Sequence, residues 1–180
     1  MRLPRQMKAQ APGQIVQLDT VHIGLLPGKT IRHFTAYDPV AKWTVGKAYN
    51  RATAASAKLF LDKLIADMPF TVEGLQVDGG SEFMAEFEAE CRLRNLKLYV
   101  LPPRSPQING GVERCNGAWR YEFYACTDLP ANVEDLNPLI DDFQDTYNFV
   151  RPHGALCGLT PAEYYLAAKP RVIASSSQMS

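Results

Sequence analysis

Three carboxylates, far apart in the sequence, are the residues best suited to chemistry. Asp19 interrupts an apolar run from Ile15 to Ile23, Asp78 precedes a Gly-Gly turn, and Glu113 follows a loop rich in Ser, Pro, Asn and Gly. Phosphodiester chemistry at neutral pH needs an activated oxygen nucleophile and a stabilised leaving oxygen, and two divalent ions roughly 3.5–4 Å apart serve both. Hard ions such as Mg²⁺ prefer carboxylate oxygens as ligands. The three residues therefore predict a metal site for phosphodiester chemistry.

Each carboxylate is also compatible with an ordinary structural role. Asp19 would suit an edge strand, Asp78-Gly79 a simple turn, and Glu113 the first turn of a helix, where an acid favours the macrodipole. The order of the elements favours a common site instead, because sites in open α/β sheets gather outside the carboxyl ends of the strands. A lone charge inside an apolar strand is also unfavourable unless something compensates it.

Hydrophobic periodicity and turn signals predict the elements that must position these residues. We expect strands over 15–23, 30–37, 43–49, 72–78 and 96–101, and helices over 53–68, from Ser81 onward, over 111–126, 133–149 and 160–168. Thr160 and Glu163 form a capping box for the last helix. The order β-β-β-α-β-α-β-α-α, followed by the short last helix, predicts an α/β fold with a five-stranded mixed sheet flanked by helices.

The helix predicted over 111–126 carries two faces. An apolar stripe comprises Val112, Cys115, Trp119, Phe123 and Cys126. A second stripe, about 90–100° away at 100° per residue, holds Glu113, Asn116, Arg120 and Tyr124. One helix can therefore bury an apolar face and still present Glu113 to a substrate, with Asn116 and Arg120 as phosphate or base-edge contacts. Arg120 is equally compatible with an ordinary solvated surface position.

Composition and charge narrow the protein class. The 180 residues fit one domain, and no run of 18 apolar residues exists, which excludes a membrane-spanning helix. No signal segment opens the chain, so we expect a cytoplasmic protein. The four cysteines contain no C-x-x-C pair, so we expect buried reduced thiols and no His/Cys metal site.

Net charge is zero, but residues 1–60 carry +7 and residues 121–150 carry −7. A nucleic acid would favour the first region; two ordinary solvated surfaces explain the same pattern.

Four ordered motifs resemble a known family. They are Gln17–Thr20, Val77–Phe83, Ser105–Arg114 and a tail that runs from Tyr147 to His153 and continues with Leu156, Gly158, Thr160, Pro161 and Glu163. The chain is similar to the catalytic core of DDE transposases and retroviral-type integrases. The 35-residue step from Asp78 to Glu113 is at the short end of the family pattern. The tail looks most like that of bacterial insertion-sequence transposases.

The resemblance implies a ribonuclease-H-like fold with Asp19 on the first strand beside Asp78 on the fourth. It implies two Mg²⁺ or Mn²⁺ ions bound by Asp19, Asp78 and Glu113, and a polynucleotidyl transferase that cleaves an element end and joins the 3′-hydroxyl to target DNA during transposition or integration. The residues that we expect to contact DNA are Gln107, Asn109, Arg114, Asn116 and Arg120. Glycines in the loop before Glu113 would let the backbone move as DNA enters.

The resemblance also bears on organisation and partners. We expect residues 1–13 to form a flexible basic lead-in, 14–168 the integrase-type catalytic core and 169–180 a disordered tail. We expect no end-recognition domain before residue 14, which suits an isolated core, a fragment or a truncated reading frame. Relatives act as dimers or larger assemblies, so we expect self-association, with Tyr164 and Tyr165 in a candidate surface, and a place near the bacterial nucleoid.

Two other functions stay open. One is a truncated, non-catalytic partner that binds DNA or a full-length transposase. The other is a plain ribonuclease-H-like nuclease without joining activity, which the tail motif disfavours.

Overall fold

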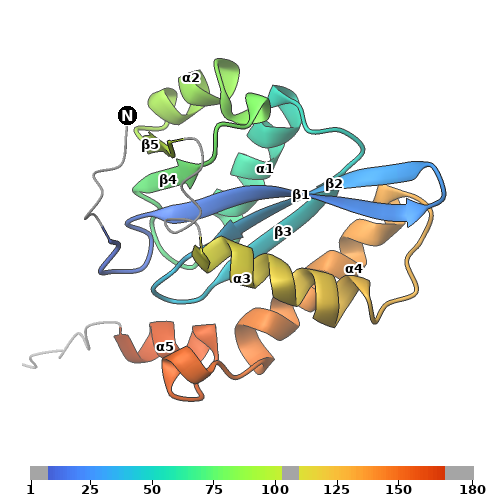
Figure 1. Ribbon diagram of the computed structural model, residues 1–180. Coiled ribbons are helices and arrows are strands. Elements are labelled where there is room, and N and C mark those ends of the chain that lie inside the picture. The colour runs from blue at the N-terminus through green and yellow to red at the C-terminus, as the bar shows by residue number, and fades with distance from the viewer. Residues whose placement is uncertain (1–7, 103–109, 169–180) are drawn as a thin grey trace, which may run out of the picture.

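The computed structural model describes residues 8–102 and 110–168 and contains a sheet of five strands in the order β3-β2-β1-β4-β5 (Figure 1). The strands are β1 (Val16–Leu26), β2 (Lys29–Tyr37), β3 (Thr44–Tyr49), β4 (Gly74–Val77) and β5 (Lys97–Val100). The first three pair antiparallel as a meander, while β4 pairs parallel with β1 and with β5. The predicted mixed sheet is confirmed.

The helices follow the predicted order. They are α1 (Ala54–Asp67), α2 (Glu86–Leu93), α3 (Gly110–Ala118), α4 (Val133–Asp145) and α5 (Pro161–Ala168). Helices α3 and α4 continue as π-helical turns, η3 (Trp119–Tyr124) and η4 (Thr146–Val150), and two short 3₁₀ turns are η1 (Ser81–Phe83) and η5 (Gly154–Leu156). Among the described residues, no helix combines the length and apolarity that a membrane crossing requires.

The second helix begins later than predicted. Ser81 starts the 3₁₀ turn η1 rather than capping a helix, and α2 begins only at Glu86, after Ala85 adopts a φ of 43°. The change of direction still delivers Phe83 and Phe87 to the same core, with ring centroids 5.3 Å apart. Burial of the two rings therefore outweighs a continuous helix across this segment.

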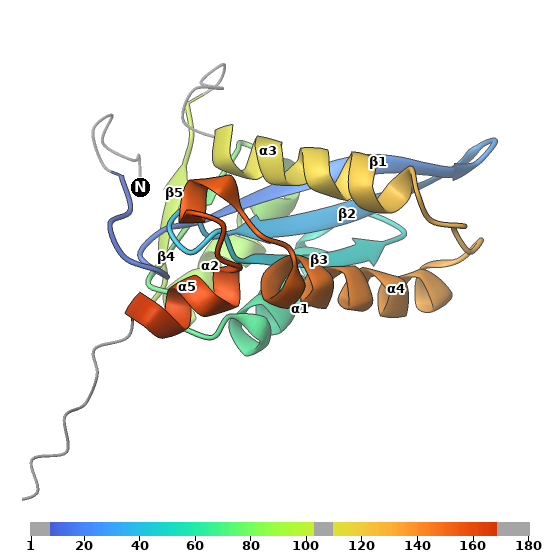
Figure 2. The ribbon, with the colours of Figure 1, turned by 90° about the horizontal axis from the view of Figure 1, so that it is seen from below.

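The two faces of the sheet support separate cores. On β1, Val16 and Leu18 face a core shared with α1 and α2, whereas Val21 and Ile23 face a core shared with α3 and α4. This alternation follows from the two-residue period of a strand. Figure 2 shows α3 on one side of the strands and α1 on the other. Asp19 has the same parity as Val21, so it lies on the α3 face.

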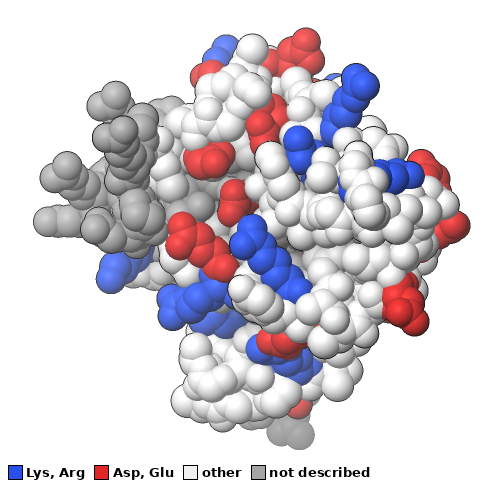
Figure 3. All heavy atoms as spheres, turned by 45° about the vertical axis from the view of Figure 1, so that its right-hand side comes forward, with Lys and Arg blue, Asp and Glu red and all other residues white. Residues whose placement is uncertain are grey.

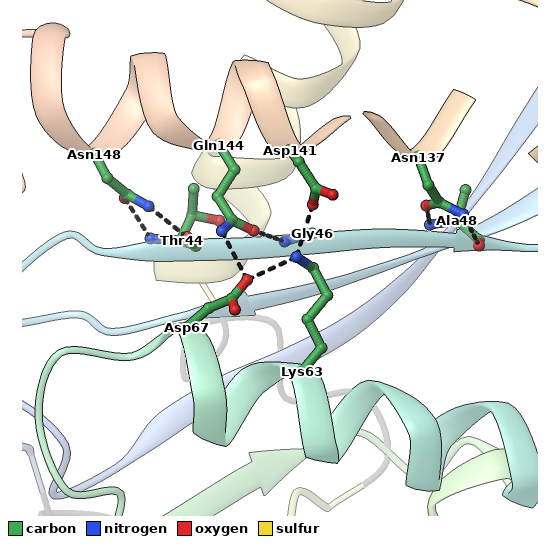
Figure 4. A network of polar contacts seen from close by, with 9 residues as sticks. All are labelled: Thr44, Gly46, Ala48, Lys63, Asp67, Asn137, Asp141, Gln144 and Asn148. Atoms are coloured by element: carbon green, nitrogen blue, oxygen red, sulfur yellow. Dashed lines mark hydrogen bonds and ion pairs between the residues drawn. The ribbon is translucent and has the colours of Figure 1, made fainter. Parts of the chain in front are cut away.

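Amide side chains from α4 and η4 cover the outer edge of β3 (Figure 4). Asn148 accepts the N–H of Thr44 at 2.9 Å and donates to the Thr44 carbonyl at 2.8 Å. Asn137 makes the same pair of bonds with Ala48, at 2.9 and 3.1 Å. Gln144 accepts the N–H of the residue midway between them at 3.0 Å. Since unpaired edge groups invite pairing with another chain, these amides close the edge.

The predicted capping box at α5 is present, and α1 begins with a second one. At α1, Thr53 accepts the N–H of Ser56, whose side chain bonds the Thr53 backbone. At α5, the N–H of Glu163 bonds the Thr160 hydroxyl at 3.1 Å, and the Glu163 carboxylate accepts the Thr160 N–H at 2.9 Å. Both helix starts were therefore readable from local sequence.

The prediction of four buried cysteines is wrong for two of them. Cys91 and Cys115 are buried, whereas Cys126 and Cys157 are exposed. Cys126 was placed on the apolar stripe of the third long helix, but the π-helical turn η3 changes the helical phase before that position. Trp119 and Phe123 remain buried because they stand earlier in the turn.

Tyr164 and Tyr165, the expected self-association residues, already have partners within the chain. The Tyr165 hydroxyl donates to the Pro69 carbonyl at 2.7 Å, and its ring lies 5.4 Å from that of Phe70. Tyr164 packs against the core shared by α1 and α2. Intramolecular packing therefore takes up much of their surface.

Candidate carboxylate site

Parallel pairing of β1 and β4 brings two of the predicted carboxylates together. Gln17 pairs in register with Gln76, and Asp19 and Asp78 each stand two residues further along. Alternate residues of a strand share a face, so all four lie on the face that α3 covers. The predicted adjacency of the first and fourth strands is confirmed.

A side chain from β1 holds the start of α3 and thereby positions Glu113. The Oε1 atom of buried Gln17 accepts the N–H of Val112 at 3.0 Å, one of the first-turn donors that have no partner within a helix. A Cβ atom at Gly111 would lie 2.5 Å from this oxygen, so the close approach requires glycine. This role of Gln17 was not predicted from the sequence. Its position two residues before Asp19, on the same face of the strand, could have indicated it.

Asp19 sits in an unfavourable environment for a carboxylate. Its Oδ1 atom accepts the Thr20 N–H at 2.8 Å, and its Oδ2 atom accepts from Asn116 Nδ2 at 2.7 Å. Burial, together with the charges of Asp78 and Glu113, nevertheless raises the pKa of Asp19 to about 6 against those two bonds. The three carboxylates are therefore close enough to repel one another. Figure 3 shows acidic side chains gathered on one face of the molecule, with Lys and Arg side chains beside them.

The donor set suits a hard divalent cation, although its geometry is open. Within residues 8–102 and 110–168, no three His, Cys, Asp or Glu side chains converge closely enough to hold one metal ion. Asp78 and Glu113 are exposed, so their carboxylates are accessible to a cation from solvent. Carboxylate oxygens are the ligands that Mg²⁺ prefers. A cation here would also relieve the repulsion that raises the pKa of Asp19.

The residues expected to contact DNA divide into two groups. Gln107 and Asn109 lie outside the described residues. Arg114 and Arg120 are exposed, and Arg114 Nε donates to the Gly110 carbonyl at 3.1 Å. Asn116 is only 5% exposed, and the Nδ2 atom of its amide bonds Asp19. Its geometry therefore fits the positioning of a carboxylate, while the two arginines face solvent.

Comparison with known proteins finds similarity to integrases. Residues 94–161 match the family model described as integrase core domain. A putative integrase, ORF3 of Spiroplasma virus SpV1-C74, is 23% identical over 144 residues, which are 71% of this chain and 40% of that protein. These two matches support a relationship to the superfamily of DDE transposases and retroviral-type integrases. It spans less than two thirds of the length of this viral relative.

Solved integrase structures share the fold. A chain of the simian T-cell lymphotropic virus intasome, solved with the PP2A regulatory subunit B56 gamma, superposes with a TM-score of 0.77 at 21% identity over 92% of this chain and 58% of that chain. The catalytic core domain of HTLV-2 integrase in complex with magnesium, in a trimeric form, gives 0.70 at 18% identity over 88% and 99%. The core domain of BIV integrase gives 0.63 at 21% identity over 86% and 95%. The fold of this integrase-type core is ribonuclease-H-like.

Proposed function

We propose that this chain is the catalytic domain of a metal-dependent DNA strand-transfer enzyme, a polynucleotidyl transferase. One observation carries the proposal: Asp19 lies half-buried just beyond the parallel pairing of β1 with β4, beside Asp78 and Glu113, and the largest causes of its pKa shift include these two charges and no Lys or Arg. Such an uncompensated acidic cluster is destabilising by itself and becomes favourable when cations bind.

Named residues take distinct roles in this proposal. Asp19, Asp78 and Glu113 would hold one or two Mg²⁺ or Mn²⁺ ions, which lower the pKa of a bound water or hydroxyl and stabilise the leaving oxygen. Asn116 orients the Asp19 carboxylate through its 2.7 Å bond, and Gln17 anchors the helix that carries Glu113. Both are positioning residues.

DNA is the proposed substrate. Exposed Arg114 and Arg120 follow Glu113 on the same helix and its continuation, where they can contact the phosphates that flank the reacting bond. Gln107 and Asn109 are assigned to the same interface by their place in the motif before Glu113.

The tail supports an assignment to bacterial insertion-sequence transposases, which act as dimers or larger assemblies on DNA near the nucleoid. Arg151 of this motif makes a two-bond ion pair with Glu122, at 2.6 and 2.7 Å, and lies over the Tyr147 ring at 5.2 Å. The ion pair thus connects the segment after η4 to η3, the continuation of α3, and α3 carries Glu113 of the proposed site.

A plasmid assay with a matched control tests the activity. The protein is incubated with supercoiled plasmid and a labelled DNA duplex with free 3′-hydroxyl ends, in Mn²⁺, Mg²⁺ or EDTA. We expect nicking and joining in metal and none in EDTA. Glu113→Gln should lower the rate by about 100-fold or more, since it removes a metal ligand. Glu86→Gln should keep the wild-type rate, because Glu86 is also a first-turn acid but lies on α2.

The same assay can overturn the proposal. If the wild-type protein binds the plasmid but neither nicks nor joins it in any metal, the catalytic reading is wrong, and a non-catalytic partner of a full-length transposase explains the chain better. Nicking without joining, with ends of the labelled duplex supplied in excess, would favour a plain nuclease.

A further inference from the structure

A cavity of about 880 Å³ adjoins the carboxylates and has no role in the function proposed above. Gln17 and Gln76, which precede Asp19 and Asp78 by two residues, form part of its wall. Two residues of a strand span about 6.6 Å. The cavity therefore begins within about one or two nucleotides of the carboxylates along a DNA strand, where phosphates recur about every 3.4 Å of duplex axis.

Helix α3 forms one side of the cavity. Arg114, Gly117, Ala118 and Tyr121 line the cavity at the i, i+3, i+4 and i+7 positions of one stripe. Glu113 begins the neighbouring stripe, so the two sites share one helix. The small residues at the middle of the stripe leave room, and a Cβ atom added at Gly117 would meet nothing within 4 Å.

The cavity wall is cationic. Its charged residues are Lys8, Lys42, Arg114, Arg151 and Glu122. Glu122 is paired with Arg151 at 2.6 Å. Lys42 donates to the Pro39 carbonyl at 2.6 Å, and neither it nor Arg114 forms an ion pair with any described acid. Burial and the nearby Arg114 both lower the pKa of Lys42. The charge of Asp38 raises the pKa of Lys42 against these effects, but neither cation has an ion-pair partner among the described residues, so together they can bind an anion.

Aromatic rings complete the wall. Tyr37, Tyr147 and His153 lie inside it, and Tyr121 stands at its exposed side with 74% of its surface accessible. An exposed ring beside unpaired cations is the combination with which proteins hold single-stranded nucleic acid, since bases stack on the ring while phosphates contact the cations.

We propose that this cavity accepts one unpaired nucleotide of the DNA strand beside the reacting phosphate. Lys42 and Arg114 contact its phosphate, and its base stacks on Tyr121. The volume lies in the range of small-molecule sites, and a base must leave the duplex to enter such a cavity. The proposal rests on the proposed function, because it takes DNA to be the substrate, but it is tested below without catalysis.

The first test measures binding in EDTA. The probe is a short duplex with a one-nucleotide overhang of 2-aminopurine, whose fluorescence falls when the base stacks. Gly117→Leu should fill the cavity, raise the Kd by about tenfold or more and abolish the fall in fluorescence. Gly117→Ala should bind like the wild type. Both substitutions replace glycine within a helix by a better helix former, so both variants should fold.

The second test separates base from phosphate. Tyr121→Ser should abolish most of the fluorescence change, whereas Lys42→Gln and Arg114→Gln should each lower the slope of log K against log salt by about 0.7, the value for one phosphate contact on a single strand. Arg92→Gln, an exposed arginine on α2 paired with Glu88, is the matched control and should change neither measurement.

The outcomes distinguish this inference from the proposed function. If Gly117→Leu and Tyr121→Ser bind the overhang with wild-type affinity and wild-type loss of fluorescence, the cavity holds no nucleotide, whatever the plasmid assay gives. If the variants behave as expected but the wild type shows no metal-dependent nicking, the strand-transfer proposal fails while the nucleotide site stands.

Discussion

The polar groups at the outer edge of β3 and those around Asp19 on β1 are arranged in opposite ways. At β3, the amides of Asn137, Gln144 and Asn148 bond backbone donors and acceptors at 2.8–3.1 Å. At β1, the charges of Asp78 and Glu113 raise the pKa of Asp19, and no basic side chain is among the largest causes of its shift. At the β3 edge, polar groups are paired with donors and acceptors of the same chain, whereas the Asp19 carboxylate faces two charges of its own sign.

The comparison separates groups that stabilise the fold from groups held ready for a ligand. Buried polar groups normally find partners, and perturbed carboxylates cluster at functional sites. Removing an amide from the β3 edge should therefore lower stability, whereas neutralising the carboxylate should lower activity and raise stability. Four predictions test this contrast, from the largest expected effect to the smallest.

Asp19→Asn should have the largest effect and should move activity and stability in opposite directions. Loss of a metal ligand should lower plasmid nicking by about 1,000-fold or more. In metal-free buffer at pH 8, the free energy of unfolding should rise by about 1–3 kcal/mol. The pKa of Asp19 in the folded protein, about 6, exceeds its ordinary value of 3.8. Asp19 therefore contributes its full stabilisation below about pH 4, and this contribution is lost as the pH rises through 6.

Urea unfolding at pH 4 and pH 8 checks the stability part, with Asp128→Asn on the exposed surface as the control. A variant less stable than the wild type at pH 8 would show that Asp19 is a structural group and would remove the contrast with the β3 edge.

Asn148→Ala should lower the free energy of unfolding by about 2–4 kcal/mol, because it leaves the buried N–H and carbonyl of Thr44 without partners. Asn137→Ala removes an equivalent pair of bonds at Ala48, but in a partly buried place, so its loss should be about 1 kcal/mol. Urea unfolding measures both. Equal losses would mean that burial does not decide how much each pair of bonds contributes to the free energy of unfolding.

Acid should destabilise the fold through His33, at the core beneath α3. Its ring lies 4.6 Å from that of Trp119, its Nδ1 atom is 2.8 Å from the Tyr124 hydroxyl, and burial lowers its pKa to about 3. The unfolded chain binds the proton below about pH 6.5, so stability should fall by up to about 1.4 kcal/mol per pH unit from 6.5 toward 3. His33→Gln should flatten this dependence.

Thermal unfolding between pH 7 and pH 4.5 measures this dependence of stability on pH. The control is His22→Gln, at an exposed position on β1, which should keep the wild-type slope. A slope in His33→Gln as steep as that of the wild type would assign the acid sensitivity to other groups.

Asp141→Asn should have the smallest effect. Asp141 is 54% exposed and bonds Lys63 at 2.7 Å, while Asp67 contacts the same Lys63 at 2.6 Å and remains (Figure 4). The loss in stability should be below about 1 kcal/mol and should vanish in 1 M salt. A larger loss that persists in salt would make this ion pair part of the α1–α4 connection rather than a surface contact.

Local sequence predicted the order and type of the helices and strands. The start of the second helix and the burial of Cys126 were predicted wrongly, because packing and helix geometry decide them. Thr53 and Thr160 mark their helix starts because capping acts within three residues. Ser81 looks like a cap but starts a 3₁₀ turn, since Phe83 and Phe87 pack best with a break between them. Cys126 leaves the apolar stripe because a π-helical turn precedes it, which a 100° period does not foresee.

The sequence by itself determined which residues could form the proposed site. The apolar run around Asp19, the glycine turn after Asp78 and the position of Glu113 in the first turn of a helix are local properties, and they place Asp19 within a strand and the other two acids at element ends. The tertiary structure alone decided how these ends meet: the bond from Gln17 to Val112 joins residues 95 apart, and those from Asn148 to Thr44 join residues 104 apart. The reason is physical, because periodicity specifies only the face of an element, whereas the partner of that face depends on how the whole chain packs.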